Sequence, residues 1–168
     1  MKHLYFVRHG ESVRNVERTY AGQFDTPLTD RGRDQARAAG EQARGLRFDL
    51  MVSSPLSRAL ETARIIARAT GYPADKILVN DIFKERAFGT MEGKSWHEIP
   101  EEMAPSYGGE SEEQVLVRAK QSLDFLRSLK TDTILLVGHG TFFRMLRTAL
   151  DPSKAYEEPE NARIVQLL

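Results

Sequence analysis

Apolar residues along this chain fall into short runs that alternate with longer, periodic segments. The short runs are rich in aliphatic and aromatic side chains, which is typical of strands buried in a sheet. They cover residues 2–8, 48–53, 77–79, 133–137 and, as an edge strand, 163–168. Because strands and helical segments take turns along the chain, the pattern predicts an α/β fold. We expect a single domain over residues 1–168, a three-layer sandwich whose mostly parallel central sheet is flanked by helices.

The longer segments place small or apolar residues every three or four positions, which is the spacing of an amphipathic helix. They run from about 29 to 45, 54 to 71, 111 to 129 and 141 to 150. Ser54 and Pro55 predict a helix start, because serine caps free backbone N–H groups and proline fits the first helical position. Small residues on one face of the first helix predict close packing against a neighbour; these are Ala36, Ala39, Gly40 and Ala43.

Two segments lack this periodicity. Residues 10–28 predict a polar loop. Residues 81–107 carry several glycines and prolines, and they predict an irregular loop over the functional site with one short helix around 95–99.

Composition narrows the class of protein. The 168 residues are enough for one hydrophobic core, and the 24 basic and 24 acidic residues cancel. Without a basic tail or run, we expect neither nucleic acid nor an anionic membrane as a partner. No cysteine is present, so disulfides, thiolate catalysis and thiolate metal ligation are excluded. The chain enters a strand at once, with no secretory leader and no run that could span a bilayer, and we expect a cytoplasmic protein.

Two of the predicted strands end in similar sequences. The first runs into Arg8-His9-Gly10, and the strand 133–137 runs into a Gly-His-Gly triplet centred on His139. In open α/β sheets, ligands bind at the carboxyl ends of parallel strands. We therefore expect His9 and His139 to meet there, together with Arg8. Two imidazoles and a guanidinium predict an anion site, and phosphate is the anion that fits this set best.

His9 is a candidate nucleophile. A lone histidine at a strand end is more often a hydrogen-bonded structural residue. Here Arg8 adds a second polar group where an apolar run stops, and Gly10 lets the backbone approach a ligand closely. A neutral imidazole is available near pH 7 because its unperturbed pKa is about 6.5. It can attack phosphorus and carry the phosphoryl group as phosphohistidine.

Two predicted helix starts supply further groups for an anion. Gly140 and Thr141 follow His139, and backbone N–H groups at a helix N-terminus favour anions, although Gly-His-Gly alone is also an ordinary tight turn. Arg58 lies in the first turn of its helix, where a cation opposes the helix dipole. A bound anion removes that conflict, and Arg58 with Arg8 can grip a phosphate through paired hydrogen bonds. The alternative for Arg58 is a solvated surface side chain.

A phosphate ester of an alcohol also needs a proton for its leaving oxygen. A carboxyl group in the irregular segment can donate that proton and then activate water. The candidates are Asp81, Glu85 and Glu92, and their spacing alone does not separate them. Each of them is also compatible with a plain surface carboxylate.

Taken together, these residues resemble the signature of the histidine phosphatase superfamily, in its phosphoglycerate mutase-like branch. The resemblance begins at Arg8-His9-Gly10-Glu11-Ser12 with Asn15 and continues in order over nearly the whole chain. The further matching blocks are Pro27-Leu28-Thr29 with Gly32 and Gln35-Ala36, Ser53-Ser54-Pro55 with Arg58-Ala59 and Thr62-Ala63, Glu85-Arg86 with Phe88-Gly89 and Glu92-Gly93, Gly109-Glu110-Ser111 with Arg118, Val137-Gly138-His139-Gly140, and Asn161. Jointly, these blocks are highly specific.

The resemblance implies a role for each matching residue. His9 matches the nucleophile that becomes phosphorylated, and Glu85 matches the general acid, which sets it apart from Asp81 and Glu92. The remaining implied residues are His139 as a catalytic and phosphate-binding group, Arg8, Asn15, Arg58 and Gly140 as phosphate ligands, and Gly22 and Gln23 as substrate contacts. Neither a metal nor a cofactor is implied, because arginines and imidazoles take the place that Mg²⁺ fills in other phosphoryl transfers.

The function implied is a phosphatase that hydrolyses phosphomonoesters of a small metabolite. The family's mutases carry a longer insertion around 81–107, and a short covering loop leaves the site open to water, which favours hydrolysis. The alternative is a cofactor-dependent phosphoglycerate mutase. A non-catalytic binding module is disfavoured because every matched catalytic position is filled, and a metal-binding protein because His3 and His97 lie in no ligand-spaced cluster. The sequence leaves open the ester, which is a sugar phosphate, a phosphoglycerate, a nucleotide-related ester or a phosphoprotein, and it leaves open a homodimer.

Overall fold

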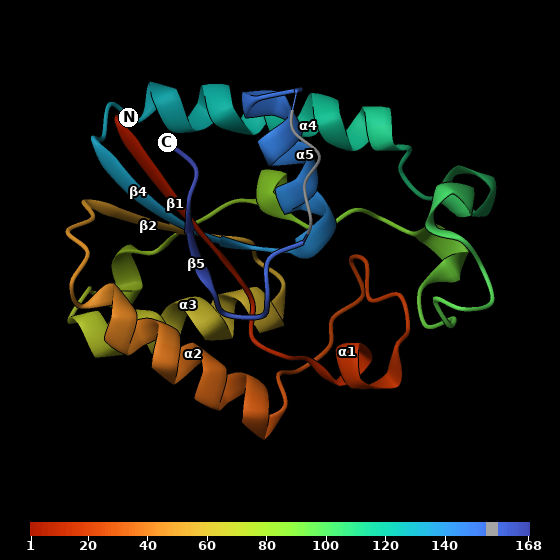
Figure 1. Ribbon diagram of the computed structural model, residues 1–168, viewed down its shortest axis with the longest axis horizontal. Helices are drawn as coiled ribbons and strands as arrows, with labels where there is room; N and C mark the ends of the chain where they lie inside the picture. The colour runs from red at the N-terminus through yellow and green to blue at the C-terminus, as the bar shows by residue number, and fades with distance from the viewer. Residues whose placement is uncertain (154–157) are drawn as a thin grey trace.

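A computed structural model describes residues 1–153 and 158–168 (Figure 1). These residues contain one five-stranded sheet in the order β3-β2-β4-β1-β5. Its strands are β1 His3–Arg8, β2 Leu50–Ser53, β3 Leu78–Val79, β4 Thr133–Gly138 and β5 Ile164–Gln166. All neighbouring strands pair in parallel except β5, which runs antiparallel to β1 at the edge. The predicted α/β fold with a mostly parallel sheet is confirmed, and so is the edge strand near the end of the chain.

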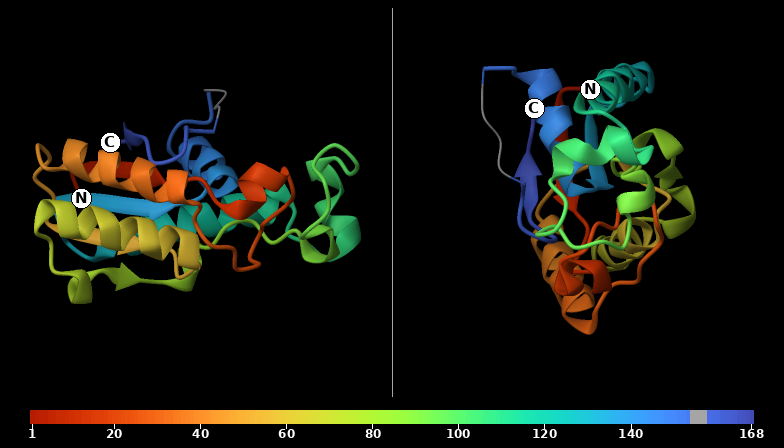
Figure 2. Two further views of the ribbon diagram at one scale, coloured as in Figure 1. Left: turned by 90° about the horizontal axis from the view of Figure 1, so that it is seen from below. Right: turned by 90° about the vertical axis from the view of Figure 1, so that its right-hand side faces the viewer.

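Helices cover both faces of the sheet. Figure 1 shows α2 and α3 below the strands and α4 and α5 above them, and the turned views of Figure 2 show the same three layers. The α-helices are α1 Val13–Glu17, α2 Asp30–Ala43, α3 Ser57–Thr70, α4 Glu112–Ser128 and α5 Gly140–Leu150. Short 3-10 helices are η1 Ala74–Lys76, η2 Asp81–Phe83, η3 Gly89–Met91 and η4 Glu101–Tyr107.

The apolar runs of the sequence become strands with two buried faces. Successive side chains of a strand point to opposite faces. In β1, Leu4 and Phe6 therefore pack into the core beneath α4 and α5, while Val7 packs into the core shared with α2 and α3. Both cores are fully buried, and they hold β1 and β4 side by side so that the two strands end at the same place.

Three details of the sequence prediction were wrong. The helix expected from Ser54 begins at Ser57, whose N–H is capped by the Asp25 side chain at 2.8 Å. Residues 95–99 are not helical, because this segment pairs with the loop that follows α1, through a bridge between Thr19 and Ser95. The predicted polar loop 10–28 contains the short helix α1.

Candidate active site

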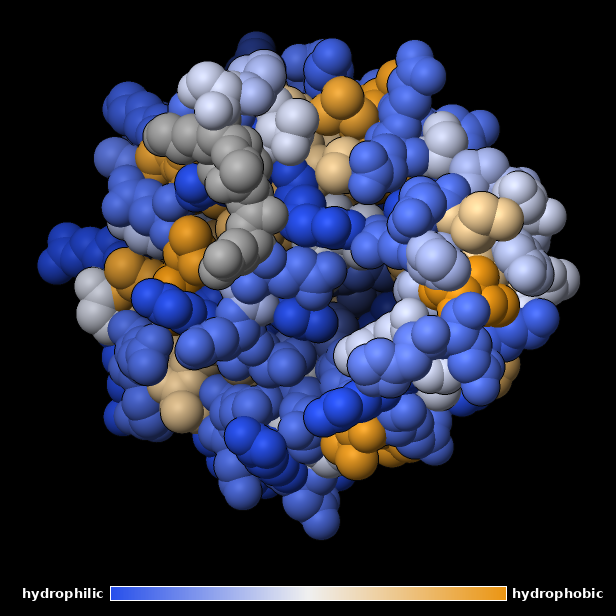
Figure 3. Space-filling model, turned by 45° about the vertical axis from the view of Figure 1, so that its right-hand side comes forward, coloured by the Kyte–Doolittle hydropathy of each residue, from blue (hydrophilic) through white to orange (hydrophobic). Residues whose placement is uncertain are grey.

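The carboxyl ends of the central strands open into a cavity of about 300 Å³. Figure 3 shows this side of the molecule, where the surface is hollowed and mostly hydrophilic around the hollow. The cavity is lined by Arg8, His9, Asn15, Thr19, Tyr20, Ala21, Gly22, Arg58, Glu85, Phe88, Trp96, Glu101, Thr141 and Glu158. Six of the predicted site residues are thus brought together, although they come from segments far apart in the sequence: Arg8, His9, Asn15, Gly22, Arg58 and Glu85.

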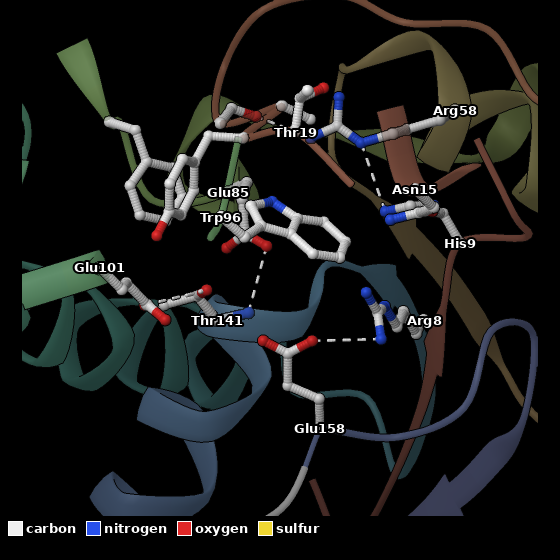
Figure 4. A pocket seen from close by; sticks show the side chains of 14 residues that line it. Arg8, His9, Asn15, Thr19, Arg58, Glu85, Trp96, Glu101, Thr141 and Glu158 are labelled. Carbon is white, nitrogen blue, oxygen red and sulfur yellow. Dashed lines mark hydrogen bonds and ion pairs between the residues drawn. The ribbon is translucent and has the colours of Figure 1, made fainter. Parts of the chain in front are cut away.

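His9 directly follows β1, and its backbone and ring are both fixed. The Asn161 side chain donates to the His9 carbonyl oxygen at 2.9 Å. The ring Nδ1 lies 2.7 Å from the carbonyl oxygen of Gly10. Because a carbonyl oxygen can only accept, Nδ1 carries the ring hydrogen and Nε2 keeps its lone pair. Arg58 Nε donates to that Nε2 at 3.3 Å, and Figure 4 shows His9 between Arg58 and Arg8.

Burial keeps both histidines of the site neutral. It lowers the pKa of His9 well below 6.5, and the charges of Arg58 and Arg8 lower it further. The pKa of His139 is lowered in the same way, first by burial and then by Arg58. A neutral imidazole keeps the lone pair on Nε2, which accepts from Arg58 here and can act as a nucleophile at pH 7 once Arg58 donates to a bound phosphate instead.

His139 follows β4, is wholly buried, and lies against His9 with 5.3 Å between the ring centroids. Its Nε2 is 2.8 Å from the hydroxyl oxygen of Ser54. That oxygen already accepts the N–H of Leu56, so its own hydrogen is available for Nε2. When Ser54 donates to Nε2, the ring hydrogen of His139 is on Nδ1, which has no hydrogen-bond partner in the described part of the chain. In that tautomer, Nδ1 can donate to a ligand bound at His9.

Arg58 is 1% exposed, and its guanidinium is oriented by the loop before α2, which contains Gly22 and Phe24. Its guanidinium donates to the carbonyl oxygens of Gly22 at 2.7 Å and Phe24 at 3.1 Å. Burial lowers the pKa of Arg58 to about 10, so the side chain stays charged at neutral pH. Gly22 has a φ of +49°, and a Cβ there would come within 2.2 Å of the Glu92 carboxylate, so this position needs glycine.

Arg8 already holds an anion of the protein itself. Its Nη1 donates to the Pro159 carbonyl oxygen at 3.1 Å and pairs with the Glu158 carboxylate at 3.1 Å (Figure 4). A phosphate at His9 would therefore compete with Glu158 for Arg8.

The other predicted ligands divide into two groups. Asn15 lines the cavity, and its Oδ1 accepts from the backbone and hydroxyl of Ser12, so its amide hydrogens remain for a ligand. Gly140 and Gln23 do not line the cavity. The Gln23 side chain instead donates to the backbone carbonyl oxygen of Glu85 at 3.1 Å, and so it helps to position the backbone of that residue.

Glu85 brings a buried carboxyl group to the cavity. Its oxygens accept backbone N–H bonds from Arg86 at 2.9 Å, Phe142 at 2.9 Å and Thr141 at 3.1 Å. The N-terminus of α5, which the sequence predicted to bind an external anion, thus binds this carboxylate. Burial and then the charge of Glu158 raise the pKa of Glu85 above 4.5, although the hydrogen bonds from Arg86 and Phe142 and the charge of Arg58 act in the opposite direction.

The competing acidic residues lie elsewhere. Asp81 is exposed and pairs with Lys84 at 2.8 Å. Glu92 accepts the backbone N–H groups of Gln23 at 3.0 Å and Phe88 at 3.1 Å, and it does not line the cavity. Of the three carboxyl groups that the sequence left equivalent, Glu85 is therefore the one that lines the cavity.

Sequence reasoning missed the outer part of the cavity. The lining residues that the sequence did not single out are Thr19, Tyr20, Ala21, Phe88, Trp96, Glu101 and Glu158, whereas Thr141 was expected as a backbone donor. The one available signal was the single tryptophan of the sequence, in a segment otherwise rich in polar residues.

Within residues 1–153 and 158–168, no three or more His, Asp or Glu side chains gather in a way that could hold a metal ion. No helix in the same ranges has the length and apolar character to cross a membrane.

Comparison with known proteins places this geometry in context. A model of the histidine phosphatase superfamily (branch 1) matches residues 4–165. A 2,3-bisphosphoglycerate-dependent phosphoglycerate mutase from Parvibaculum lavamentivorans is 34% identical over 167 residues, covering 88% of this chain and 79% of that protein. A phosphoglycerate mutase from Bacillus anthracis superposes with a TM-score of 0.86 at 25% identity, over 98% of this chain and 86% of that one. A mycobacterial glucosyl-3-phosphoglycerate phosphatase in complex with VO3 superposes with a TM-score of 0.85 at 27% identity, over 99% of this chain and 92% of that one.

Proposed function

Because this chain belongs to the histidine phosphatase superfamily (branch 1), we propose that it hydrolyses phosphomonoesters through a phosphohistidine at His9, without a metal ion. One observation carries the proposal. The Nε2 lone pair of a neutral His9 lies beside the charged Arg58, in a cavity that also holds the buried carboxyl group of Glu85. Nucleophile, cation and proton donor therefore share one small space.

The first step transfers the phosphoryl group to His9. Arg58, Arg8, Asn15 and the Nδ1 hydrogen of His139 bind the phosphate oxygens, with Arg8 released from Glu158. Nε2 attacks phosphorus, the bond from phosphorus to the ester oxygen breaks, and protonated Glu85 gives its proton to that oxygen. The phosphorylated ring is a cation that keeps its Nδ1 hydrogen on the Gly10 carbonyl oxygen.

The second step regenerates the site. The alcohol leaves, and the Glu85 carboxylate takes a proton from an entering water while the water oxygen attacks phosphorus. The P–N bond breaks, inorganic phosphate leaves, and His9 returns to its neutral form. Glu85 is protonated again and ready for the next substrate.

A mutase is the second candidate, and the names of the relatives favour it. It would use the same His9 and return the phosphoryl group to another hydroxyl of a phosphoglycerate instead of to water. We favour hydrolysis of a small phosphorylated metabolite, and we propose that it takes place in the cytoplasm.

Phosphate release from a panel of phosphomonoesters, measured with excess EDTA, tests this function. We expect turnover to persist with EDTA, because arginines and imidazoles carry the phosphate charge. His9→Ala should lose at least about a thousandfold in kcat, as removal of a covalent nucleophile does. The matched control is His3→Ala, which alters an exposed histidine at the other end of β1 and should keep full activity.

Two results would contradict the proposal. One is loss of activity on chelation with recovery on adding Mg²⁺ or Zn²⁺. The other is isomerisation of phosphoglycerate without release of inorganic phosphate, which would identify a mutase.

A further inference from the structure

The cavity continues outward from His9 into a part with a different character. Its walls there are aromatic. Trp96 is 41% exposed, and the buried rings of Tyr20 and Phe88 contact each other at a tilt of 38°, with 4.6 Å between their centroids. Figure 4 shows the Trp96 indole between Glu101 on one side and the group of Arg58, His9 and Arg8 on the other. A phosphate at His9 would leave its ester group facing this indole.

The indole is held in place and is not on a free loop. The Trp96 backbone N–H donates to the Arg18 carbonyl oxygen at 3.1 Å, and the preceding residue, Ser95, forms a bridge with Thr19. The same loop contains Gly22, whose carbonyl oxygen aims Arg58. Trp96 and the phosphate-binding arginine are therefore positioned by one segment, and such preorganisation favours binding.

The charges of this outer part disfavour a second anion on the substrate. Among the described lining residues the cations are Arg8 and Arg58, and both lie at the His9 end. Glu101 is held by Arg86 at 3.1 Å and by Arg144 at 2.5 Å, so those two guanidinium groups are already paired. A carboxylate on the substrate and that of Glu101 can both only accept hydrogen bonds, so they cannot bond to each other, and the two nearby arginines are engaged by Glu101.

The same pairing disfavours a cationic substrate, because Glu101 has its charge matched by two arginines. Paired carboxylate oxygens still have lone pairs that accept hydrogen bonds from hydroxyl groups. An indole face offers a large apolar surface for the C–H face of a saturated ring. Trp96 and Glu101 thus suit a molecule that is uncharged, cyclic and rich in hydroxyl groups.

We infer that the outer cavity is a leaving-group site for an uncharged sugar ring, packed on Trp96 with its hydroxyls donating to Glu101. The preferred substrates are monophosphates of cyclic sugars, and phosphoglycerates are disfavoured. For turnover this inference rests on the proposed function, but ligand binding tests it separately.

The binding test uses His9→Ala, which forms no phosphohistidine, and takes Trp96 fluorescence as the signal because the sequence has no other tryptophan. Glucose 6-phosphate should bind about tenfold more tightly than its open-chain counterpart sorbitol 6-phosphate, since a fitted apolar contact is worth that much. Binding of glucose 6-phosphate should also shift the fluorescence emission of Trp96. Phosphocholine should bind no more tightly than inorganic phosphate. When Trp96→Leu is combined with His9→Ala, affinities measured by calorimetry should no longer favour glucose 6-phosphate over sorbitol 6-phosphate. Met103 is an exposed residue of η4 outside the cavity, so Met103→Ala combined with His9→Ala should leave the preference for glucose 6-phosphate unchanged.

The charge test compares glycerol 3-phosphate with 3-phosphoglycerate, which differ only in a hydroxymethyl group against a carboxylate. For the wild type we expect kcat/KM to favour glycerol 3-phosphate by about tenfold or more. Glu101→Gln removes one negative charge beside Arg144. It should therefore reduce the ratio of kcat/KM for glycerol 3-phosphate to kcat/KM for 3-phosphoglycerate.

Each outcome has a distinct meaning. Equal binding of glucose 6-phosphate and sorbitol 6-phosphate, an unchanged preference in Trp96→Leu, or tighter binding of phosphocholine would overturn the sugar site without bearing on the phosphatase activity. A preference for 3-phosphoglycerate would overturn it as well. Ring-selective binding by His9→Ala, with no phosphate release by the wild type, would support the site and refute the proposed function.

Discussion

The carbonyl oxygen of Gly10 decides which nitrogen of His9 can react. It accepts a hydrogen bond from Nδ1, with 2.7 Å between nitrogen and oxygen. The lone pair is therefore on Nε2, beside Arg58. Burial lowers the pKa of His9, so a proton does not block that lone pair at neutral pH. Both effects come from backbone close to the histidine and from its depth in the fold, and neither can be read from the residue type.

Glu85 is poised between two protonation states. Burial and the nearby Glu158 favour the neutral carboxyl group, while hydrogen bonds from backbone N–H groups favour the carboxylate. The proposed reaction needs the protonated form first and the carboxylate second. A raised pKa also means that the first step on alkyl esters should slow as pH rises through that pKa, because the proton is then lost before it is needed.

Replacement of Glu85 by glutamine should separate substrates by their leaving groups. An alkoxide needs the proton, so Glu85→Gln should slow the first step on alkyl esters by about 10² to 10⁴. Nitrophenol leaves without help, so p-nitrophenyl phosphate should still phosphorylate His9 and give a burst of nitrophenol. A slow steady state should follow, because water attack on phosphohistidine lacks its base. Rapid-mixing absorbance measurements resolve the two phases.

The matched controls for this prediction are Asp81→Asn and Glu92→Gln, which should show neither effect. If the first step in Glu85→Gln slows equally for both kinds of ester, Glu85 positions the phosphate and is not the acid. A burst in Glu92→Gln would move the acid to Glu92.

At the scale of elements, α2 and α3 show why small residues face one another. A Cβ on Gly40 of α2 would lie 2.6 Å from the Cβ of Ala69 on α3. That distance is below van der Waals contact and involves two short, rigid groups. The close packing predicted from the small residues of α2 is confirmed at this position, where α2 lies against the last turn of α3.

Gly40→Ala should therefore destabilise the protein although alanine favours helices. Helix propensity would stabilise by about 1 kcal/mol, but overpacking costs about 1–3 kcal/mol, so the free energy of unfolding should fall by about 1 kcal/mol. In an Ala69→Gly background the clash is gone, and the same substitution should stabilise. Urea denaturation measures both. A gain from Gly40→Ala in the native background would show that the helices lie further apart.

The elements also show where the sequence was informative. Strands and the long helices follow from apolar periodicity, because burial of one face requires it. The start of α3 was misplaced because its cap, Asp25, comes from a distant loop while Ser54 bonds with His139. The segment 95–99 was misread because its pairing with Thr19 is a long-range contact, which local propensity does not record.

At the scale of the molecule, the parallel sheet brings distant residues to one point. The pairing of β1 with β4 sets Arg8 opposite Gly138, so His9 and His139 follow from neighbouring strand ends. That convergence was predictable from the sequence, since strand ends in such sheets share an edge. The outer cavity was not, because Trp96 and Glu158 reach it from irregular segments whose paths depend on tertiary contacts.

The most direct test of the whole account is to trap the phosphoryl group on the enzyme. A ³²P-labelled phosphomonoester is mixed with the wild type, quenched in alkali within milliseconds and mapped by peptide analysis. We expect an alkali-stable, acid-labile label on the peptide that carries His9, formed and lost at rates that match turnover, and no label in His9→Ala. An acid-stable label on a serine, or full turnover by His9→Ala, would contradict it.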